Sequence, residues 1–349
     1  MLCLNYNVSA TQSVSFGKRT AKSTNERTIF MKKSLSVLLT LAFILCAFSV
    51  SCARKPQHDS DVSFNVAVLK GPTGMGAAKL IGDEYENYNV TVESSPDAVT
   101  GKFISGEYDV AAVPVNLASV LYNKLEGDVV MLGVTTLGVL YVVENGNEVN
   151  SIADLAGKPV DATGQGSTPE YIINYLLEKN DISDKVEINY HAEHSELTSL
   201  LGSGSVRIGI LPEPNVTAVL NSNPDLRIAL NLTEEWNKVC STECVQGVLI
   251  ARKGFAAENK TAVEQFIKDY AASSDFVVNN IDDAAKLIVE AGILPSEDIA
   301  KKAIPNCNIV FYSGERMKKA AEGMYSVLFA SNPKSIGGKL PEADFYFGA

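Results

Sequence analysis

The chain has 349 residues, of which 46% are hydrophobic, and it carries a formal net charge of −11. This length and apolar content suffice for one large domain or for two lobes with buried cores. The acidic balance and the lack of a long basic run argue against nucleic acid as a partner.

The first fifty residues predict export. Met31 and two lysines precede an apolar run at 35–50, and small residues follow it, as in a secretory signal peptide at 31–51. The run is shorter than the ~20 residues of a membrane-spanning helix, although an uncleaved anchor is the alternative. Residues 1–30 are polar and patternless, so we interpret them as a non-native or mis-started extension.

Cys52 closes this segment. The stretch SVSC, residues 49–52, resembles a bacterial lipoprotein processing box, in which the cysteine is lipidated and becomes the mature N-terminus. Ser49 departs from that pattern, which has a leucine-like residue there. Residues 52–61 are polar and are expected to form a lipid-anchored tether. We therefore expect an exported protein, anchored to the cell membrane and facing the periplasm or the exterior.

Short apolar runs alternate with stretches of helical spacing from Phe64 onward. FNVAVL (64–69) and VVMLGVTT (129–136) are typical of strands, whereas YIINYLLEKN (171–180) is typical of an amphipathic helix. This alternation predicts an α/β fold with largely parallel sheets.

Two parts of the chain resemble each other. SGEYDVAAVPVNLASVL (105–121) and SGSVRIGILPEPNVTAVL (203–220) share Ser-Gly, an apolar strand, a proline with an asparagine, and an apolar helix face. GPTGMG (71–76) and GQGSTPE (164–170) form a second pair in the same order, and Gly-Val-Leu at 138 and at 247 forms a third. The repetition predicts two similar lobes.

The glycine-rich stretch GPTGMG invites comparison with a phosphate-binding loop. Gly71 and Gly76 have the spacing of a P-loop, but Ala77 and Ala78 stand where the lysine and the hydroxyl are needed. We therefore predict either a tight turn or a turn that also contacts a ligand. Ligands of open parallel sheets bind at the carboxyl ends of strands, where helix N-termini offer free N–H groups. Four segments fit that position: 71–76, 114–117, 164–170 and 212–215.

Two of these segments carry distinctive polar groups. Ser167 or Thr168 is expected to cap a helix, with Ser167 and Glu170 forming a capping box. In LPEPN, Glu213 stands between two prolines and would favour a cationic group in a cleft; a solvated loop position is the alternative.

Histidines and cysteines suggest further sites. YHAEHSEL (190–197) gathers potential metal ligands, but its spacing matches no standard site, so we predict no metal and treat His194 as a contact to an organic ligand. Cys240 and Cys244 could close a small disulfide, or could remain unpaired thiols together with Cys307. Trp236 fits either a core or a lid position. No nucleophile elbow, CxxC or HExxH motif occurs, so we predict no catalytic residue and no cofactor.

The stretch SIADLAGKPVDATGQGSTPEY (151–171) resembles the signature of type 2 periplasmic binding proteins, the substrate-binding components of ABC importers. GPTGMG, GEYDV before VPVN, and SIGGKLP (335–341) are similar to the branch that binds nitrate, sulfonates, taurine and thiamine precursors. The resemblance implies an α/β, two-lobed fold with two hinge crossover strands and a ligand cleft between the lobes. Lobe 1 would comprise 62–136 plus 250–349, and lobe 2 would comprise 137–249.

The resemblance also implies a function. Such a protein closes on a small polar, anionic or zwitterionic solute and delivers it to an ABC permease and its ATPase, and we expect a monomer. The alternatives are an enzyme on the same fold, of thiamine-precursor or menaquinone-type biosynthesis, and a ligand-sensing module. The expected ligand-binding residues are Gly74, Met75, Asn116, Thr136, Gln165, Gly166, Ser167, Thr168, His194 and Glu213.

Overall fold

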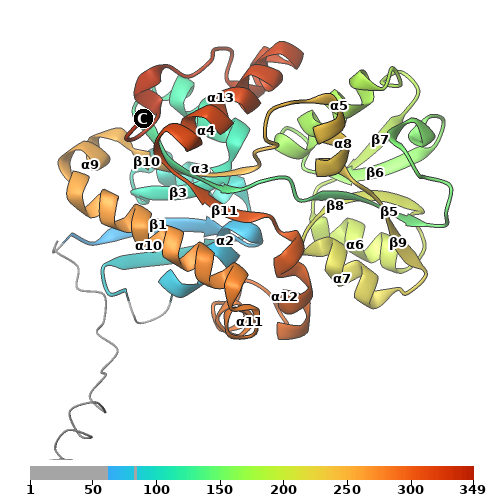
Figure 1. Ribbon diagram of the computed structural model, residues 1–349, viewed down its shortest axis with the longest axis horizontal. Coiled ribbons are helices and arrows are strands. Elements are labelled where there is room, and N and C mark those ends of the chain that lie inside the picture. The colour runs from blue at the N-terminus through green and yellow to red at the C-terminus, as the bar shows by residue number, and fades with distance from the viewer. Residues whose placement is uncertain (1–61, 82–84) are drawn as a thin grey trace, which may run out of the picture. The chain divides into compact units, whose positions relative to one another are not determined.

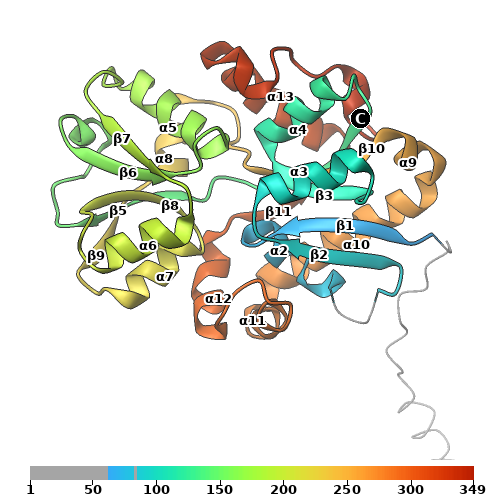
Figure 2. The same cartoon turned by 180° about the vertical axis from the view of Figure 1, so that it is seen from behind.

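The computed structural model describes residues 62–81 and 85–349. The predicted signal peptide, Cys52 and the tether lie outside these residues. Residues 56–349 cluster as one compact unit. In Figures 1 and 2 its strands form two groups, each covered by helices, and we name them the six-stranded lobe and the five-stranded lobe.

The six-stranded sheet has the order β11-β4-β10-β3-β1-β2. Its strands are β1 (Phe64–Leu69), β2 (Tyr88–Glu93), β3 (Val110–Pro114), β4 (Val129–Thr136), β10 (Gly247–Arg252) and β11 (Ile309–Tyr312). The five-stranded sheet has the order β7-β6-β8-β5-β9. Its strands are β5 (Leu140–Asn145), β6 (Pro159–Thr163), β7 (Glu187–His191), β8 (Ile208–Pro212) and β9 (Leu226–Asn231).

The two sheets share one topology, as the sequence repetition predicts. In the six-stranded sheet β1 pairs in parallel with β2 and β3, and β10 runs antiparallel between β3 and β4. In the five-stranded sheet β6 pairs in parallel with β7 and β8, and β5 runs antiparallel between β8 and β9. The repeated segments correspond to β3 and β8, each followed by a helix.

The sheets are mixed, so the prediction of largely parallel sheets is wrong. The antiparallel strands β5 and β10 each follow a segment of the chain that crosses over from the other sheet. A strand that enters a sheet through such a crossover can run in either direction. The chain passes between the sheets at 137–139 and at 240–246. Because β10 begins at Gly247, residues 247–249 belong to the six-stranded sheet rather than to the predicted lobe 2.

Helices cover both faces of each sheet. They are α2 (Pro72–Gly76), α3 (Pro96–Ser105), α4 (Val115–Lys124), α5 (Thr168–Lys179), α6 (His194–Gly202), α7 (Asn215–Ser222), α8 (Leu232–Val239), α9 (Lys253–Glu258), α10 (Lys260–Asn279), α11 (Ile281–Glu290), α12 (Glu297–Ala303) and α13 (Gly314–Ser331). Short 3₁₀ turns are η1 (Ala78–Leu80), η2 (Ile152–Leu155), η3 (Ile304–Asn306), η4 (Pro333–Ile336) and η5 (Ala343–Phe345).

The core follows from the two-residue period of the strands. Phe64, Val66 and Val68 of β1 pack into one cluster with residues of α10, whereas Ala67 packs into another with residues of α3. Successive side chains of a strand point to opposite faces, so a continuous apolar run such as FNVAVL needs cover on both. Figure 2 shows α3 on the face of the sheet opposite α10.

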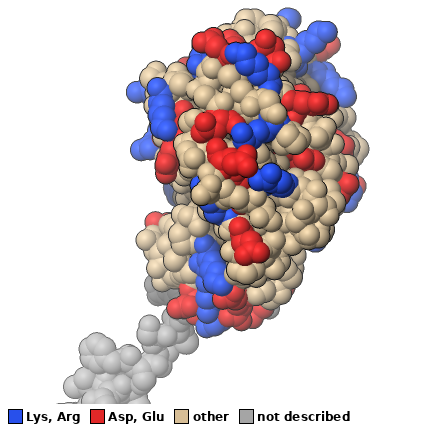
Figure 3. Space-filling model, turned by 90° about the vertical axis from the view of Figure 1, so that its right-hand side faces the viewer, with Lys and Arg blue, Asp and Glu red and all other residues tan. Residues whose placement is uncertain are grey.

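No helix in the described ranges is long and apolar enough to cross a membrane. Lysine and arginine side chains are interspersed with aspartate and glutamate side chains on the face of the molecule drawn in Figure 3. This face therefore presents no large region of a single charge.

Candidate functional site

The sequence predicts a site at the carboxyl ends of the parallel strands, which lie at one end of each sheet. The strands β1, β3, β6 and β8 are followed directly by α2, α4, α5 and α7, so all four predicted segments lie at this edge of their sheets. Two segments come from each lobe. The edge therefore brings polar residues of both lobes to the same side of their sheets.

Asn116 joins the two lobes. Its Oδ1 accepts a hydrogen bond of 2.8 Å from Thr168 Oγ1, and its Nδ2 lies 3.5 Å from the carbonyl oxygen of Gly166. The same Nδ2 donates to the carbonyl oxygen of Ser335 over 3.3 Å. Asn116 is the second residue of α4 and Thr168 is the first of α5, and both are buried. The structure thus places two predicted site residues in direct contact across the lobe boundary.

The same contact brings two helix N-termini together. Pro114 caps α4 and Ser167 caps α5, and neither makes a side-chain bond to its helix. The first N–H groups of a helix lack intrahelical partners and carry a partial positive charge. Two such ends that approach each other favour an electron-rich group between or beside them.

Two threonines at the end of β4 present unpartnered hydroxyl groups. Thr135 and Thr136 are 1% and 3% exposed, and neither Oγ1 has a hydrogen-bond partner among the described residues. The register of β4 against β10 shifts at this point, because Gly247 faces Thr136 while Val248 already faces Val134. Thr135 is therefore the extra residue of a bulge, a feature that re-aims side chains at a strand end.

Gly247 packs closely against these threonines. A Cβ atom at Gly247 would lie 3.1 Å from Thr135 Oγ1, 3.1 Å from Thr136 Cβ and 3.0 Å from Thr73 Cγ2. The neighbouring Gln246 has a buried Nε2 without a partner in the described ranges, although its backbone N–H donates to Thr136 O over 2.9 Å. Buried polar groups are normally paired, so these three groups are candidate contacts for a polar ligand.

Sequence reasoning missed three of these residues. Thr73, Thr135 and Gln246 stand at the ends of predicted strands or in the predicted loops. Thr135 could have been found from its position next to Thr136 at the end of VVMLGVTT. The bulge that turns Thr135 depends on pairing with β10, more than a hundred residues away in the chain.

The glycine-rich stretch is a turn of helix rather than an open loop. Thr73 to Gly76 are buried in α2, and a Cβ at Gly74 would lie 2.6 Å from the carbonyl oxygen of Leu69. Met75 is fully buried, packs with an apolar cluster, and its Sδ lies 4.0 Å from Cys307 Sγ. Met75 therefore contributes to the core of the six-stranded lobe, and the contact of Gly74 and Met75 with a ligand stays a prediction.

The second glycine segment is more open. Gly164 and Gly166 adopt φ values of 83° and 75°, and Gln165 and Gly166 are exposed. Ser167 is the N-cap residue, as predicted, but its side chain makes no capping bond. Glu170 accepts instead from the N–H of Gly166 over 2.5 Å. The predicted capping box is thus wrong, whereas the predicted helix start is confirmed.

The two histidines have different surroundings. His194 Nδ1 lies 2.7 Å from Thr163 Oγ1, and desolvation by the surrounding protein lowers the pKa of His194 although the residue is exposed. His191 Nε2 lies 2.7 Å from Asp161 Oδ1 and its Nδ1 lies 3.3 Å from Glu196 Oε1. The hydrogen bond to Asp161 raises the pKa of His191. Within residues 62–81 and 85–349, no cluster of three or more His, Cys, Asp or Glu is placed to hold a metal ion.

Glu213 is buried, so its solvated alternative is wrong. It is 1% exposed, and its carboxylate accepts bonds from Thr217 N over 3.1 Å and from Thr217 Oγ1 over 3.0 Å. Burial raises the pKa of Glu213 from 4.5 to about 7, against the effect of these two bonds. The carboxylate therefore stabilises the first turn of α7 and remains sensitive to its surroundings.

Three residues left open by the sequence have defined positions. Trp236 is fully buried, donates from Nε1 to Thr242 O over 2.7 Å and packs against the ring of Tyr175, which makes it a core residue. Cys240 and Cys244 are free thiols in this structure, so the disulfide alternative is not formed. Cys240 Sγ lies 3.2 Å from Thr242 Oγ1 instead.

Comparison with known proteins agrees with this architecture. Residues 128–284 match the family described as "NMT1/THI5 like". An ABC transporter from Parabacteroides distasonis is 26% identical, with a TM-score of 0.69 over 82% of this chain and 99% of that one. The aliphatic sulphonate binding protein SsuA from Escherichia coli is 15% identical, with a TM-score of 0.65 over 81% and 94%.

A ligand-bound structure is also similar. The alkanesulfonate-binding protein SsuA from Xanthomonas axonopodis pv. citri, bound to MOPS, is 13% identical, with a TM-score of 0.61 over 78% of this chain and 94% of that one. No curated protein matches the sequence significantly. The chain has the two-lobed fold of the type 2 periplasmic binding proteins. Its predicted resemblance to these proteins is confirmed, and the two sulphonate-binding proteins share its fold.

Proposed function

We propose that this protein is the extracytoplasmic substrate-binding component of an ABC importer. It would close its two lobes on a small polar solute and deliver that solute to a permease and its ATPase. The observation that carries the proposal is the pair of buried hydroxyls of Thr135 and Thr136, unpartnered within the described residues, at the strand ends where the lobes meet through Asn116 and Thr168. If no ligand bound here, the two buried hydroxyls would lack hydrogen-bond partners, and each would lower the stability of the fold.

The residues favour an anionic or zwitterionic solute. Hydroxyl and carboxamide donors and two helix N-termini suit an acceptor group such as a sulfonate or carboxylate. The names of the solved relatives, which bind sulphonates, support the same class. The proposed ligand-binding residues are Gly74, Met75, Asn116, Thr136, Gln165, Gly166, Ser167, Thr168, His194 and Glu213, joined by Thr73, Thr135 and Gln246.

Anchoring through a lipidated Cys52 and a monomeric state are parts of the same proposal. Both follow from the sequence pattern and from the class of protein. An enzyme on the same fold is the alternative, since the matching family is named partly for THI5. A test for chemical turnover of the bound compound separates the two.

A thermal-shift screen tests the proposal. Residues 56–349, which form a compact unit, would be heated with nitrate, taurine, alkylsulfonates, aminomethyl-hydroxymethyl-pyrimidine, amino acids and divalent metals. A solute at a hundred times its Kd adds about 2.7 kcal/mol to the free energy of unfolding, which raises Tm by several degrees. A shift of undiminished size in the Thr135→Val/Thr136→Val double variant would contradict the assigned site.

A further inference from the structure

Glu213 lies where the two lobes touch. It follows β8 of the five-stranded lobe, and a Cβ on Gly71 of the six-stranded lobe would lie 4.0 Å from Cδ of the next residue, Pro214. Beside it, Tyr141 of β5 donates from its hydroxyl to Asn306 O of η3 over 3.2 Å, which is a second contact between the lobes. Glu213 also interacts electrostatically with Cys307, which precedes β11. The carboxyl group of Glu213 therefore lies near the boundary between the two lobes.

The carboxyl group has no positive partner among the described residues. Both of its hydrogen bonds come from Thr217, and no lysine, arginine or histidine in these ranges forms an ion pair with it. A buried carboxylate without a counter-charge is costly, and protonation removes that cost. Separation of the lobes would return water to the group and remove most of the penalty.

From this geometry we propose that closure of the lobes takes up one proton at Glu213, so that solute binding is proton-linked. The proposal rests on the proposed function, because it assumes that the lobes open and close. The proton comes from solvent and binds a carboxylate oxygen, and no bond other than the new O–H is formed. Glu213 is then a proton-binding site beside the solute site.

The direction of the pH effect follows from linkage. In the present arrangement burial raises the pKa of Glu213 from 4.5 to about 7. The proposal implies that the pKa falls back toward 4.5 when the lobes open and water reaches the group. The closed form then binds more protons than the open form between these values, so closure is favoured by falling pH. Between pH 8 and pH 6 the ratio of closed to open molecules rises about tenfold.

The other titratable groups around Glu213 do not produce this effect. Burial raises the pKa of Tyr141 to about 12 and also raises that of Cys307, so both stay neutral between pH 6 and 8. The negative charge of Glu234 in α8 also raises the pKa of Tyr141. Glu234 is therefore a nearby carboxylate that can serve as a control position. His191 and His194 face Asp161, Glu196 and Thr163 within the five-stranded lobe.

The test measures the lobe separation without any solute. Spin labels at Gly101→Cys on α3 and Asp184→Cys in the five-stranded lobe, with Cys240→Ser, report the distance by double electron–electron resonance. Both label positions are exposed. At pH 6 the closed fraction relative to the open fraction is expected to exceed that at pH 8 about tenfold. An equal ratio at both pH values would overturn the proposal.

Variants assign the effect to one residue. Glu213→Gln removes the pH dependence, whereas Glu234→Gln and the His191→Asn/His194→Asn pair retain it. A tenfold response that persists in Glu213→Gln overturns the proposal. Should that variant fail to fold, Thr217→Val serves instead, because loss of its hydroxyl bond raises the pKa of Glu213 further and extends the response above pH 8.

The same labelled protein separates the two proposals. Adding the solute panel at pH 7 tests whether a solute closes the lobes, and failure there contradicts the proposed function. The response to pH without solute still decides whether Glu213 takes up a proton.

Discussion

Thr168 Oγ1 donates a 2.8 Å hydrogen bond to Asn116 Oδ1, and this bond connects the first turns of α5 and α4 across the lobe boundary. The two residues are separated by 52 positions in the chain and both are buried. Asn116 also holds Ser335 O within its own lobe. The bond therefore connects the Asn116 carboxamide of the six-stranded lobe to the N-terminus of α5 in the five-stranded lobe.

Replacing Thr168 by valine should loosen this tie. The change keeps the side-chain volume but leaves Asn116 Oδ1 without its donor, at a cost of about 1 kcal/mol in the free energy of unfolding. Urea denaturation measures that cost, and the spin-label distance reports an increased open fraction. Ser119→Ala is the matched control, because Ser119 donates to Ile336 O within the six-stranded lobe. An equal opening in both variants would argue against a tie between lobes.

The threonine hydroxyls at the end of β4 should matter for binding and not for folding. Since Thr135 Oγ1 and Thr136 Oγ1 have no partner in the described part of the chain, Thr135→Val and Thr136→Val should leave Tm unchanged or raise it. Each lost hydrogen bond to a solute weakens binding by about 1 kcal/mol, or roughly fivefold in Kd. Calorimetry with the solute found in the screen gives Kd. A fall in Tm with unchanged Kd would assign these hydroxyls a structural role.

The absence of a side chain at Gly247 should be essential for solute binding. In Gly247→Ala the new methyl group would stand 3.0–3.1 Å from Thr73, Thr135 and Thr136, so these side chains must shift by a few tenths of an ångström. We expect at least a tenfold loss of affinity. Gly101→Ala is the control, because nothing lies within 4 Å of its Cβ position in α3. That variant should keep its affinity and gain about 0.5–1 kcal/mol of stability from helix propensity.

Local patterns are enough to place most of the site. FNVAVL and VVMLGVTT coincide with β1 and β4, and the repeated strand–proline–asparagine units correspond to β3 with α4 and β8 with α7. These features depend on neighbours in the chain, so period and turn residues reveal them. The residue pattern alone therefore assigns Asn116 and Thr168 to the correct edge of their sheets.

The remaining features depend on distant pairing. The antiparallel insertion of β10 produces the bulge at Thr135, and no local pattern specifies which strand will lie beside β4. The burial of Met75 was not predictable either: the glycines around it indicate an open turn, whereas apolar residues from α11, α12 and the segment before β11 cover it. The burial of Glu213 is a tertiary property of the chain, and LPEPN gives no sign of it.

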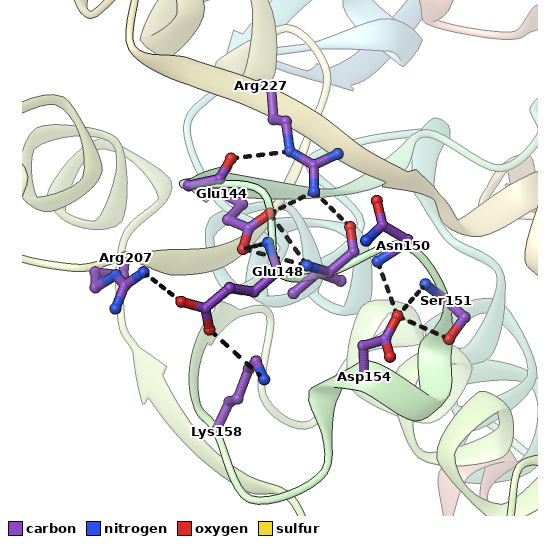
Figure 4. A network of polar contacts seen from close by, with 10 residues as sticks. Glu144, Glu148, Asn150, Ser151, Asp154, Lys158, Arg207 and Arg227 are labelled. Atoms are coloured by element: carbon purple, nitrogen blue, oxygen red, sulfur yellow. Dashed lines mark hydrogen bonds and ion pairs between the residues drawn. The ribbon is translucent and has the colours of Figure 1, made fainter.

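The turn that ends β5, at 144–149, should stabilise the five-stranded lobe (Figure 4). Glu144 is 1% exposed and accepts from Arg227 Nη2 over 2.6 Å and from the N–H groups of Glu148 and Val149. Glu144→Gln leaves Arg227 without its charge partner and should cost about 3 kcal/mol. Urea denaturation measures this loss. Glu148→Gln, which affects only exposed pairs with Arg207 and Lys158, should change stability little.

Stability should also depend on the protonation of His191. Because the bond to Asp161 raises the pKa of His191 above 6.5, the folded state holds this proton more tightly than the unfolded state does. The stabilisation is fully present below pH 6.5 and is lost as pH rises through the raised pKa. The difference in unfolding free energy between the unaltered protein and Asp161→Asn should therefore shrink as pH rises from 6 to 8. Glu213 and His194 titrate in both proteins, so their contributions cancel in this difference. A difference that stays constant across this range would show that the Asp161–His191 contact is not an ion pair.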